Sequence, residues 1–131
     1  MTDFSDMARG VIESNRYMGL GTADEAGVPW VTPVWYAQSE YRRFIWVSSP
    51  DRRHSRNVRA RPEVSIVIFD SQVLVGDARA VYMSARAEEL SGAELERDVA
   101  LFDAAGRAQG LTRRWALEDM LAPSPCAALT S

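Results

Sequence analysis

Two hydroxyl side chains and a run of cations lie close together in the stretch Phe44–Phe69 of this 131-residue chain. Ser48 and Ser49 end an apolar segment, and an arginine-rich segment follows them. Its polar members are Arg52, Arg53, His54, Arg56, Asn57, Arg59 and Arg61. Hydroxyls, guanidinium groups and a helix N-terminus are the groups with which proteins hold a phosphate. The stretch predicts an anion site, although the same arginines are equally typical of a solvated helix face.

The distribution of charge favours a small anionic ligand over a nucleic acid. The net charge is −3, and all 15 basic residues are arginine, which excludes lysine chemistry such as a Schiff base. Seven arginines and one acid lie between Tyr41 and Pro62, whereas six acids and one arginine lie between Glu88 and Asp103. An acidic chain with one basic patch is expected to bind a small anion at that patch.

Other arrangements that could do chemistry are missing from the sequence. The only histidine, His54, and the only cysteine, Cys126, cannot make a closed metal site. Gly19 and Gly21 belong to no phosphate-binding glycine motif, and no serine stands in a nucleophile-elbow pattern. Any reaction is therefore expected to depend on a bound cofactor.

Length and composition predict a single domain over residues 1–131 with an ordinary hydrophobic core, since 47% of the residues are apolar. The lone cysteine forms no internal disulfide, which is consistent with a reducing compartment. No apolar run approaches the roughly 18 residues of a membrane span, and the first residues lack the apolar core of a secretory signal. A cytoplasmic protein without membrane or nucleic-acid partners is expected.

Elements of secondary structure must position these groups. Hydrophobic periodicity and turn signals predict helix Asp3–Asn15, strands Tyr17–Ala23, Val28–Ala37 and Arg43–Ser48, helix Arg52–Ala60 with Asp51 as its N-cap, strands Glu63–Asp70 and Arg79–Leu90, and helices Gly92–Ala105 and Leu111–Leu121. Residues 122–131 show no periodicity and predict an irregular tail. Tight turns between consecutive strands favour antiparallel pairing, and five or six strands in this length favour a mostly β, small closed or split barrel.

The predicted strand Val28–Ala37 carries two prolines, Pro29 and Pro33, on one face. Because proline cannot donate to a ladder, this strand is expected at an edge or incompletely paired. Its free backbone groups can bond the edge of a flat heterocycle. Its aromatic side chains are too many for one core face and suggest a partner subunit: Trp30, Trp35 and Tyr36.

The stretch Phe44–Phe69, with the strands before and after it, resembles the pyridoxamine 5′-phosphate oxidase-like, FMN-binding split-barrel family. The resemblance covers about Val11 to Leu121 and is most specific over Ser48–Pro62, where serine, an Arg-His pair, Asn-Val and Arg-Pro-x-Val follow in order. It implies a six-stranded antiparallel split β-barrel that forms a homodimer with a flavin at the subunit interface. Relatives of this type bind FMN, the deazaflavin F420 or haem.

The resemblance also implies which residues hold the cofactor. Ser48, Arg53 and His54 would hold the phosphate, with Ser49 and Asn57 beside them. The remaining contacts, largely through the backbone along the flavin ring, would be Thr32, Pro33, Val34 and Val47. Trp30, Trp35 and the loop Val73–Val75 would be pocket wall or interface.

Three departures argue against pyridoxal phosphate synthesis. Val31–Tyr36 lacks the arginine and lysine of the true oxidases, Ala80 stands near the position of their glutamine, and the last residues lack their arginine and histidine. The functions left open are an FMN-dependent oxidoreductase acting on an unidentified small molecule, an F420-dependent reductase and a non-catalytic flavin-binding protein. No residue marks a catalytic group or a substrate.

Overall fold

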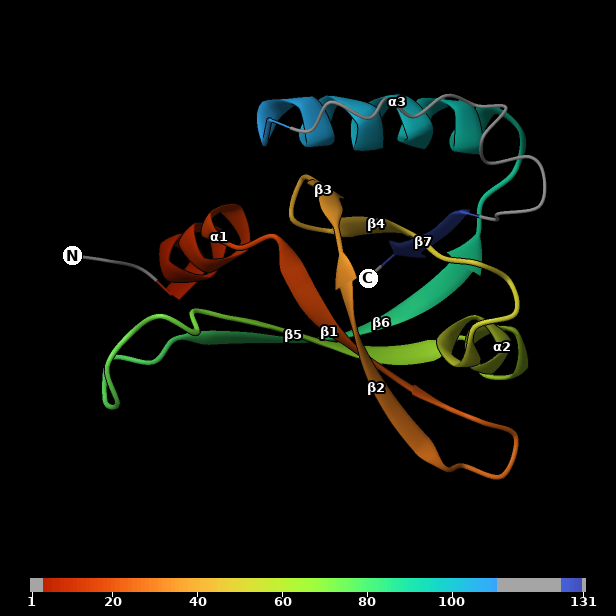
Figure 1. Cartoon of the computed structure of the whole chain (residues 1–131), viewed down its shortest axis with the longest axis horizontal. Helices are drawn as coiled ribbons and strands as arrows, with labels where there is room; N and C mark the ends of the chain where they lie inside the picture. The colour runs from red at the N-terminus through yellow and green to blue at the C-terminus, as the bar shows by residue number, and fades with distance from the viewer. Residues whose placement is uncertain (1–3, 111–125, 131) are drawn as a thin grey trace.

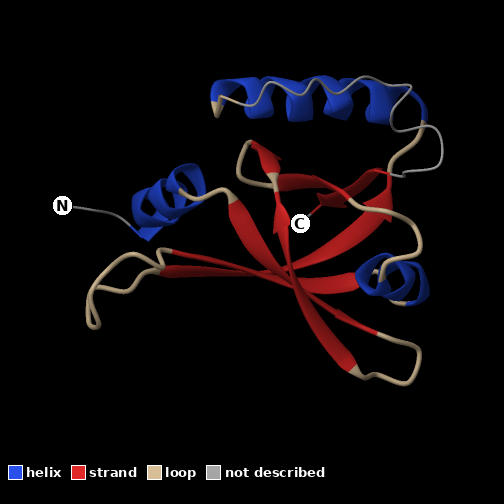
Figure 2. Ribbon diagram, in the orientation of Figure 1, coloured by secondary structure: helices blue, strands red, loops and turns tan. Residues whose placement is uncertain are grey.

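The computed structural model describes residues 4–110 and 126–130, so the predicted helix Leu111–Leu121 lies outside the described residues. The helices are α1 (Phe4–Ser14), α2 (Arg53–Ala60) and α3 (Gly92–Ala108). The strands are β1 (Tyr17–Ala23), β2 (Pro29–Trp35), β3 (Ala37–Ser39), β4 (Arg43–Val47), β5 (Glu63–Phe69), β6 (Ala80–Glu89) and β7 (Cys126–Thr130). The three helices lie on the outside of one strongly twisted sheet (Figures 1 and 2).

All pairings in the sheet are antiparallel, as the tight turns predict, and the strand order is β2-β1-β5-β6-β7-β4-β3. The sheet has seven strands and not six, because the predicted strand Val28–Ala37 divides at Tyr36 into β2 and β3. These two strands lie at opposite ends of the strand order although only Tyr36 separates them in the chain. The sheet is therefore strongly curved, since the chain passes from one edge strand to the other through this residue.

The expected irregular tail was wrong over Cys126–Thr130, which forms β7 between β4 and β6. The local sequence there has no alternation of apolar and polar residues. Its extended form comes instead from two neighbouring strands that offer a complete ladder of hydrogen bonds. The prediction failed because this signal is not local.

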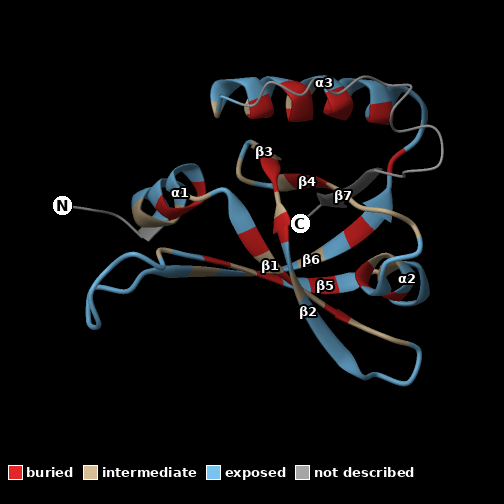
Figure 3. Cartoon of the chain, in the orientation of Figure 1, coloured by how far each residue is buried: buried red, intermediate tan, exposed pale blue. Residues whose placement is uncertain are grey.

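The core has two parts. The main cluster fills the curve of the sheet beneath α1, where Val11, Tyr36 and Trp46 are at most 4% exposed. The second cluster lies between α3 and the β3–β4 hairpin. Leu95, Val99 and Phe102 face it and are each 3% exposed, as their spacing predicts. Figure 3 shows this buried stripe along the side of α3 that faces the sheet.

A buried ion pair joins α3 to the sheet. Asp98 is 1% exposed, and both of its carboxylate oxygens accept hydrogen bonds from the Arg43 guanidinium on β4. One of these bonds measures 3.1 Å between Nη1 and Oδ1. The bidentate geometry fixes where α3 lies over the sheet.

Among the described residues, no helix is long and apolar enough to cross a membrane.

Candidate functional site

One cavity of about 840 Å³ opens between the edge strand β2, the end of β4, the start of α2 and one side of α3. The elements that surround it come from most of the chain, and the lining residues are Arg16, Tyr17, Trp30, Thr32, Pro33, Val34, Trp35, Val47, Ser48, Ser49, Arg52, Arg53, His54, Phe102 and Gln109. Three arginines and no aspartate or glutamate belong to this lining. In a chain of net charge −3, this composition indicates a site for an anion.

The structure brings together every predicted cofactor residue except Asn57. Asn57 is 4% exposed, and its Nδ2 donates to Thr22 Oγ1 over 3.0 Å. This hydrogen bond holds α2 against β1. Asn57 therefore positions the helix that carries Arg53 and His54, and its side chain does not reach the cavity.

The strand β2 meets the expectation of an edge. It pairs with β1 through seven residues, and its other side faces no strand within the described residues. An edge strand leaves a row of N–H and C=O groups unpaired. Thr32, Pro33 and Val34 lie in the wall of the cavity along this edge, where Pro33 can offer its carbonyl but no N–H.

The N-terminus of α2 is uncapped. The helix begins at Arg53 with Arg52 at the N-cap position, and no side chain bonds its first N–H groups. The prediction of Asp51 as N-cap was wrong, because the Arg52 N–H bonds the Ser49 carbonyl over 3.2 Å and this turn delays the helix by one residue. Asp51 instead accepts a hydrogen bond from the Ser49 hydroxyl, which lowers the pKa of its carboxyl group.

Arg53 is held by an aromatic ring. Its guanidinium carbon lies 4.2 Å from the centroid of the Trp30 ring. A cation above an indole face is attracted by about 0.5–1 kcal/mol at an exposed site. The contact orients the guanidinium at the mouth of the cavity and leaves its N–H edge available.

His54 positions a hydroxyl. Its Nε2 lies 2.6 Å from Ser48 Oγ, and the side chain is 9% exposed. Burial, and secondly the charge of Arg52, lower the pKa of His54 below its ordinary value. The imidazole is therefore neutral at pH 7, so it orients Ser48 without adding positive charge.

Sequence reasoning missed the wall formed by α3. The indole Nε1 of Trp35 donates to Gln109 Oε1 over 2.9 Å, and the Trp35 and Phe102 rings meet edge to face with centroids 4.7 Å apart. Periodicity identifies Phe102 as inward-facing but cannot say what it meets. Arg16 and Tyr17 were missed for the same reason, because no local signal places the end of α1 beside β2.

The described residues contain no group of three or more histidine, cysteine or acidic side chains placed to hold a metal ion.

A family profile for pyridoxamine 5′-phosphate oxidase matches residues 4–120 of the sequence. The chain belongs to the pyridoxamine 5′-phosphate oxidase family. The match includes all the cavity residues and the whole stretch Phe44–Phe69. No curated protein matches the chain in sequence.

Solved structures share the fold of this family member. A haem-binding protein from Mycobacterium smegmatis has a TM-score of 0.75 at 22% identity over 98% of this chain, which spans 51% of that protein's length. An FAD-binding protein from Mesorhizobium loti has a TM-score of 0.66 at 24% identity, covering 93% of this chain and 83% of the other. An F420 reductase has a TM-score of 0.65 at 17% identity, covering 99% and 94%.

Proposed function

We propose that the cavity binds FMN and that the protein is an oxidoreductase acting on a small molecule. The observation that carries the proposal is the convergence of two partial sites on one cavity: a phosphate-type donor set, and a strand edge with free backbone groups. Family membership supports a flavin as the ligand of such a pair. When bound, the flavin supplies the hydride or electron transfer, and the protein supplies binding and orientation.

The phosphate would lie at the start of α2. Ser48 offers a hydroxyl oriented by His54, and Arg53 offers a guanidinium oriented by Trp30. The uncapped N–H groups at the start of α2 lie at the positive end of the helix dipole, and both features favour an anion there. No carboxylate belongs to the cavity lining to compete for these donors.

The flavin ring would lie along β2. Ring nitrogen and oxygen atoms need donors and acceptors, and an edge strand carries unpaired backbone groups of both kinds. Pro33 would contribute its carbonyl as an acceptor only, since proline has no N–H. Trp30 and Trp35 give flat apolar walls that exclude water from the ring. Trp35 is the better fixed of the two, since Gln109 bonds its indole N–H.

Synthesis of pyridoxal phosphate is not the proposed reaction. The strand that would lie along the ring carries no arginine or lysine between Val31 and Tyr36. Without these cations, a substrate phosphate lacks the recognition expected of a true oxidase of this family.

An F420-dependent reductase is the second candidate. Arg52 lies next to Arg53 in the lining, and Arg56 and Arg59 follow on the exposed side of the same helix. This excess of cations suits a cofactor with a longer, more anionic tail. A structure of an F420 reductase with the same fold is consistent with that candidate. A non-catalytic flavin-binding protein remains the third.

A second copy of the chain is proposed to cover one face of the sheet, at β1, β2, β5 and β6. Val31 is 67% exposed and Tyr82 is 80% exposed on this face. Both residues line a groove of about 340 Å³ that Gly19 and Gly21 also line. A side chain at position 21 would collide with the Ser65 hydroxyl, so the close approach of β1 and β5 requires glycine there. An aromatic side chain that projects beside a groove can fill the same groove of a second copy related by a two-fold axis.

Titration of the purified protein with FMN, F420 and haem tests the proposed function. FMN is expected to bind, with a change in its visible absorbance. Arg53→Ala is expected to weaken FMN binding by about 1.5–3 kcal/mol, because it removes a charged hydrogen bond. Isothermal calorimetry gives both affinities, and turnover is then followed with reduced nicotinamide donors and candidate acceptors.

Arg56→Ala is the matched control. Arg56 lies on the same helix, but it donates to the Asp51 carbonyl over 2.6 Å and does not line the cavity. It should leave FMN affinity nearly unchanged. Binding of F420 alone would select the second candidate, whereas equal affinities for FMN in the wild type and Arg53→Ala would refute the phosphate site.

A further inference from the structure

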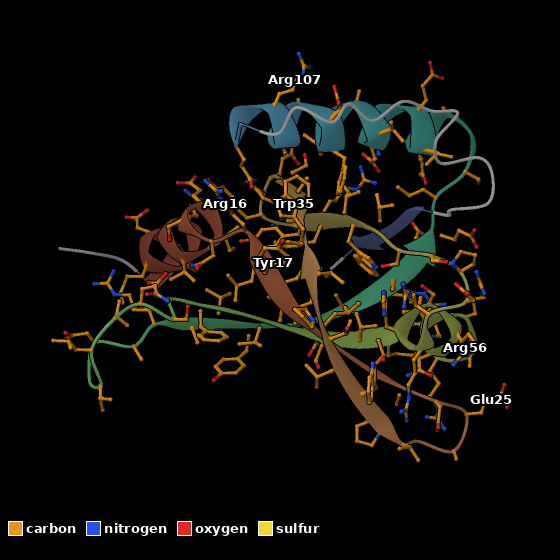
Figure 4. The ribbon with its side chains drawn as sticks, viewed as in Figure 1. Arg16, Tyr17, Glu25, Trp35, Arg56 and Arg107 are labelled. Atoms are coloured by element: carbon orange, nitrogen blue, oxygen red, sulfur yellow. The ribbon has the colours of Figure 1, made fainter. Side chains whose placement is uncertain are left out.

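The cavity has a cation at a second end, away from α2. Arg16 and Tyr17 follow α1 at the start of β1 and belong to the lining together with Gln109 of α3. Figure 4 shows Arg16 and Tyr17 beside the α1–β1 connection, across the molecule from α2. Tyr17 pairs with Trp35 at one end of β2, whereas Arg53 lies over Trp30 near the other end, so the two cationic parts of the cavity lie toward opposite ends of this strand.

Arg16 is held in place through its backbone and not through its side chain. Its carbonyl oxygen accepts a hydrogen bond from the Tyr36 N–H over 3.1 Å. The Tyr36 hydroxyl lies 2.7 Å from the Ile12 carbonyl oxygen and 2.9 Å from that of Asn15, which ties the end of α1 to the same point. Within the described residues, the exposed Arg16 guanidinium makes no hydrogen bond or ion pair.

Arginines elsewhere in the described part of the chain commonly have acidic or carbonyl partners. Arg43 pairs with Asp98, Arg107 pairs with Asp103, and Arg61 donates to a backbone carbonyl. The lining of the cavity offers Arg16 no carboxylate at all. A free guanidinium at the wall of a cavity is suited to bidentate recognition of a ligand carboxylate.

Aromatic side chains lie on the walls between the two ends. Trp30, Trp35, Tyr17 and Phe102 all line the cavity, and Trp35 is oriented by Gln109 and Phe102. Flat apolar walls favour flat ligands. A volume of about 840 Å³ lies near the upper end of ligand pockets, which span roughly 300–1,000 Å³.

We propose that the Arg16 end is the substrate subsite and that its substrates are planar aromatic carboxylates. The assignment of the opposite end to the cofactor phosphate rests on the function proposed above. The aromatic ring lies beside Tyr17 and the Trp35–Phe102 wall at this end of the cavity, and its carboxylate pairs with Arg16. This subsite makes the protein selective for an acid over the corresponding neutral amide.

Benzoate and benzamide test the subsite, because they share a ring and differ in charge. Both are titrated into the FMN-loaded full chain and, separately, into the cofactor-free chain, by calorimetry and by perturbation of the flavin spectrum. Benzoate is expected to bind about tenfold or more tightly than benzamide, as a charged hydrogen bond implies. Arg16→Gln should abolish that preference, leaving benzamide binding and FMN affinity unchanged.

Arg9→Gln is the control variant. Arg9 lies on α1, is exposed and contacts the Tyr41 ring at 5.3 Å, outside the cavity. It should keep the preference for benzoate. The subsite would be overturned if the wild type bound benzoate and benzamide equally, or bound neither. It would also be overturned if Arg16→Gln kept the preference for benzoate or lost affinity for FMN. An Arg16-dependent preference in a protein that does not bind FMN would retain the subsite and refute the flavin proposal.

Discussion

At the residue scale, the site depends on side chains that orient other side chains. His54 bonds Ser48, Trp30 holds Arg53, and Gln109 holds Trp35. Each contact reduces the freedom of a group that faces the cavity, so less conformational entropy is lost when a ligand binds. His54 is the only histidine, and its imidazole is the one side chain whose ordinary pKa lies between pH 5 and 8.

Stability should fall below about pH 6.5 because of His54. Its pKa in the folded protein is lowered by burial, whereas in the unfolded chain it is about 6.5. Between these values the unfolded chain binds the extra proton, so the free energy of unfolding falls as pH decreases, by at most about 1.4 kcal/mol per pH unit. Above pH 6.5 this contribution is fully present. Urea denaturation between pH 5 and 8 measures it.

His54→Gln removes this titration. The variant should be less stable than the wild type at pH 7, since it disturbs the bond to Ser48, but its stability should vary less between pH 5 and 6.5. Aspartate and glutamate titrate mainly below this range, with pKa values of about 4. Parallel pH profiles for the two proteins would contradict the assignment.

At the scale of elements, α3 forms one wall of the cavity and is fixed by a buried ion pair. The Arg43–Asp98 pair connects its middle to β4, while Phe102 and Gln109 contact Trp35 further along. A helix that is shifted or loosened would release the indole that Gln109 orients. The ion pair therefore affects the shape of the cavity as well as the stability of the fold.

Asp98→Ala should lower the free energy of unfolding by about 3 kcal/mol, because it leaves the Arg43 charge partly buried without its partner. Urea denaturation at pH 7 measures the loss. Glu96→Ala is the control, since Glu96 lies on the exposed side of the same helix and its variant should change stability by less than about 0.5 kcal/mol. The double variant Arg43→Met, Asp98→Leu should recover much of the loss, because apolar residues need no partner. A loss in Asp98→Ala no larger than in Glu96→Ala would refute the role of the pair.

At the scale of the whole molecule, the sheet is covered on one side by helices and exposes large apolar side chains on another. Figure 3 shows exposed lengths on β2 and at the start of β6. Tyr17, Val31, Phe69 and Tyr82 are each more than half exposed. Apolar patches of this kind on a sheet mark an interaction surface.

Tyr82→Asp should convert a dimer to a monomer, because a carboxylate would be buried without a partner in the covered groove. Size-exclusion chromatography with light scattering measures the mass. Ala100→Asp, an equivalent change on the exposed side of α3, should leave the mass unchanged. A wild-type protein that is monomeric at all concentrations tested would refute the proposed dimer.

The sequence by itself determined the elements that local patterns encode. A nearly apolar run predicted β5, and alternation predicted β6. The spacing of Leu95, Val99 and Phe102 predicted the inner face of α3, and two prolines predicted an edge or incompletely paired position for β2. The phosphate-type group from Ser48 to His54 is contiguous, so its members meet through a single strand end and helix start. Family membership followed from the same stretch.

Only the tertiary structure decided what depends on contacts between distant segments. Trp35 and Gln109 are 74 residues apart, and no local pattern relates them. The strand β7 exists because β4 and β6 leave a ladder open between them, and its own sequence does not encode it. Arg16 becomes part of the cavity because Tyr36 holds the end of α1 beside β2. Long-range hydrogen bonds and packing, which have no sequence period, therefore determine the part of the cavity formed by Arg16, Trp35 and Gln109.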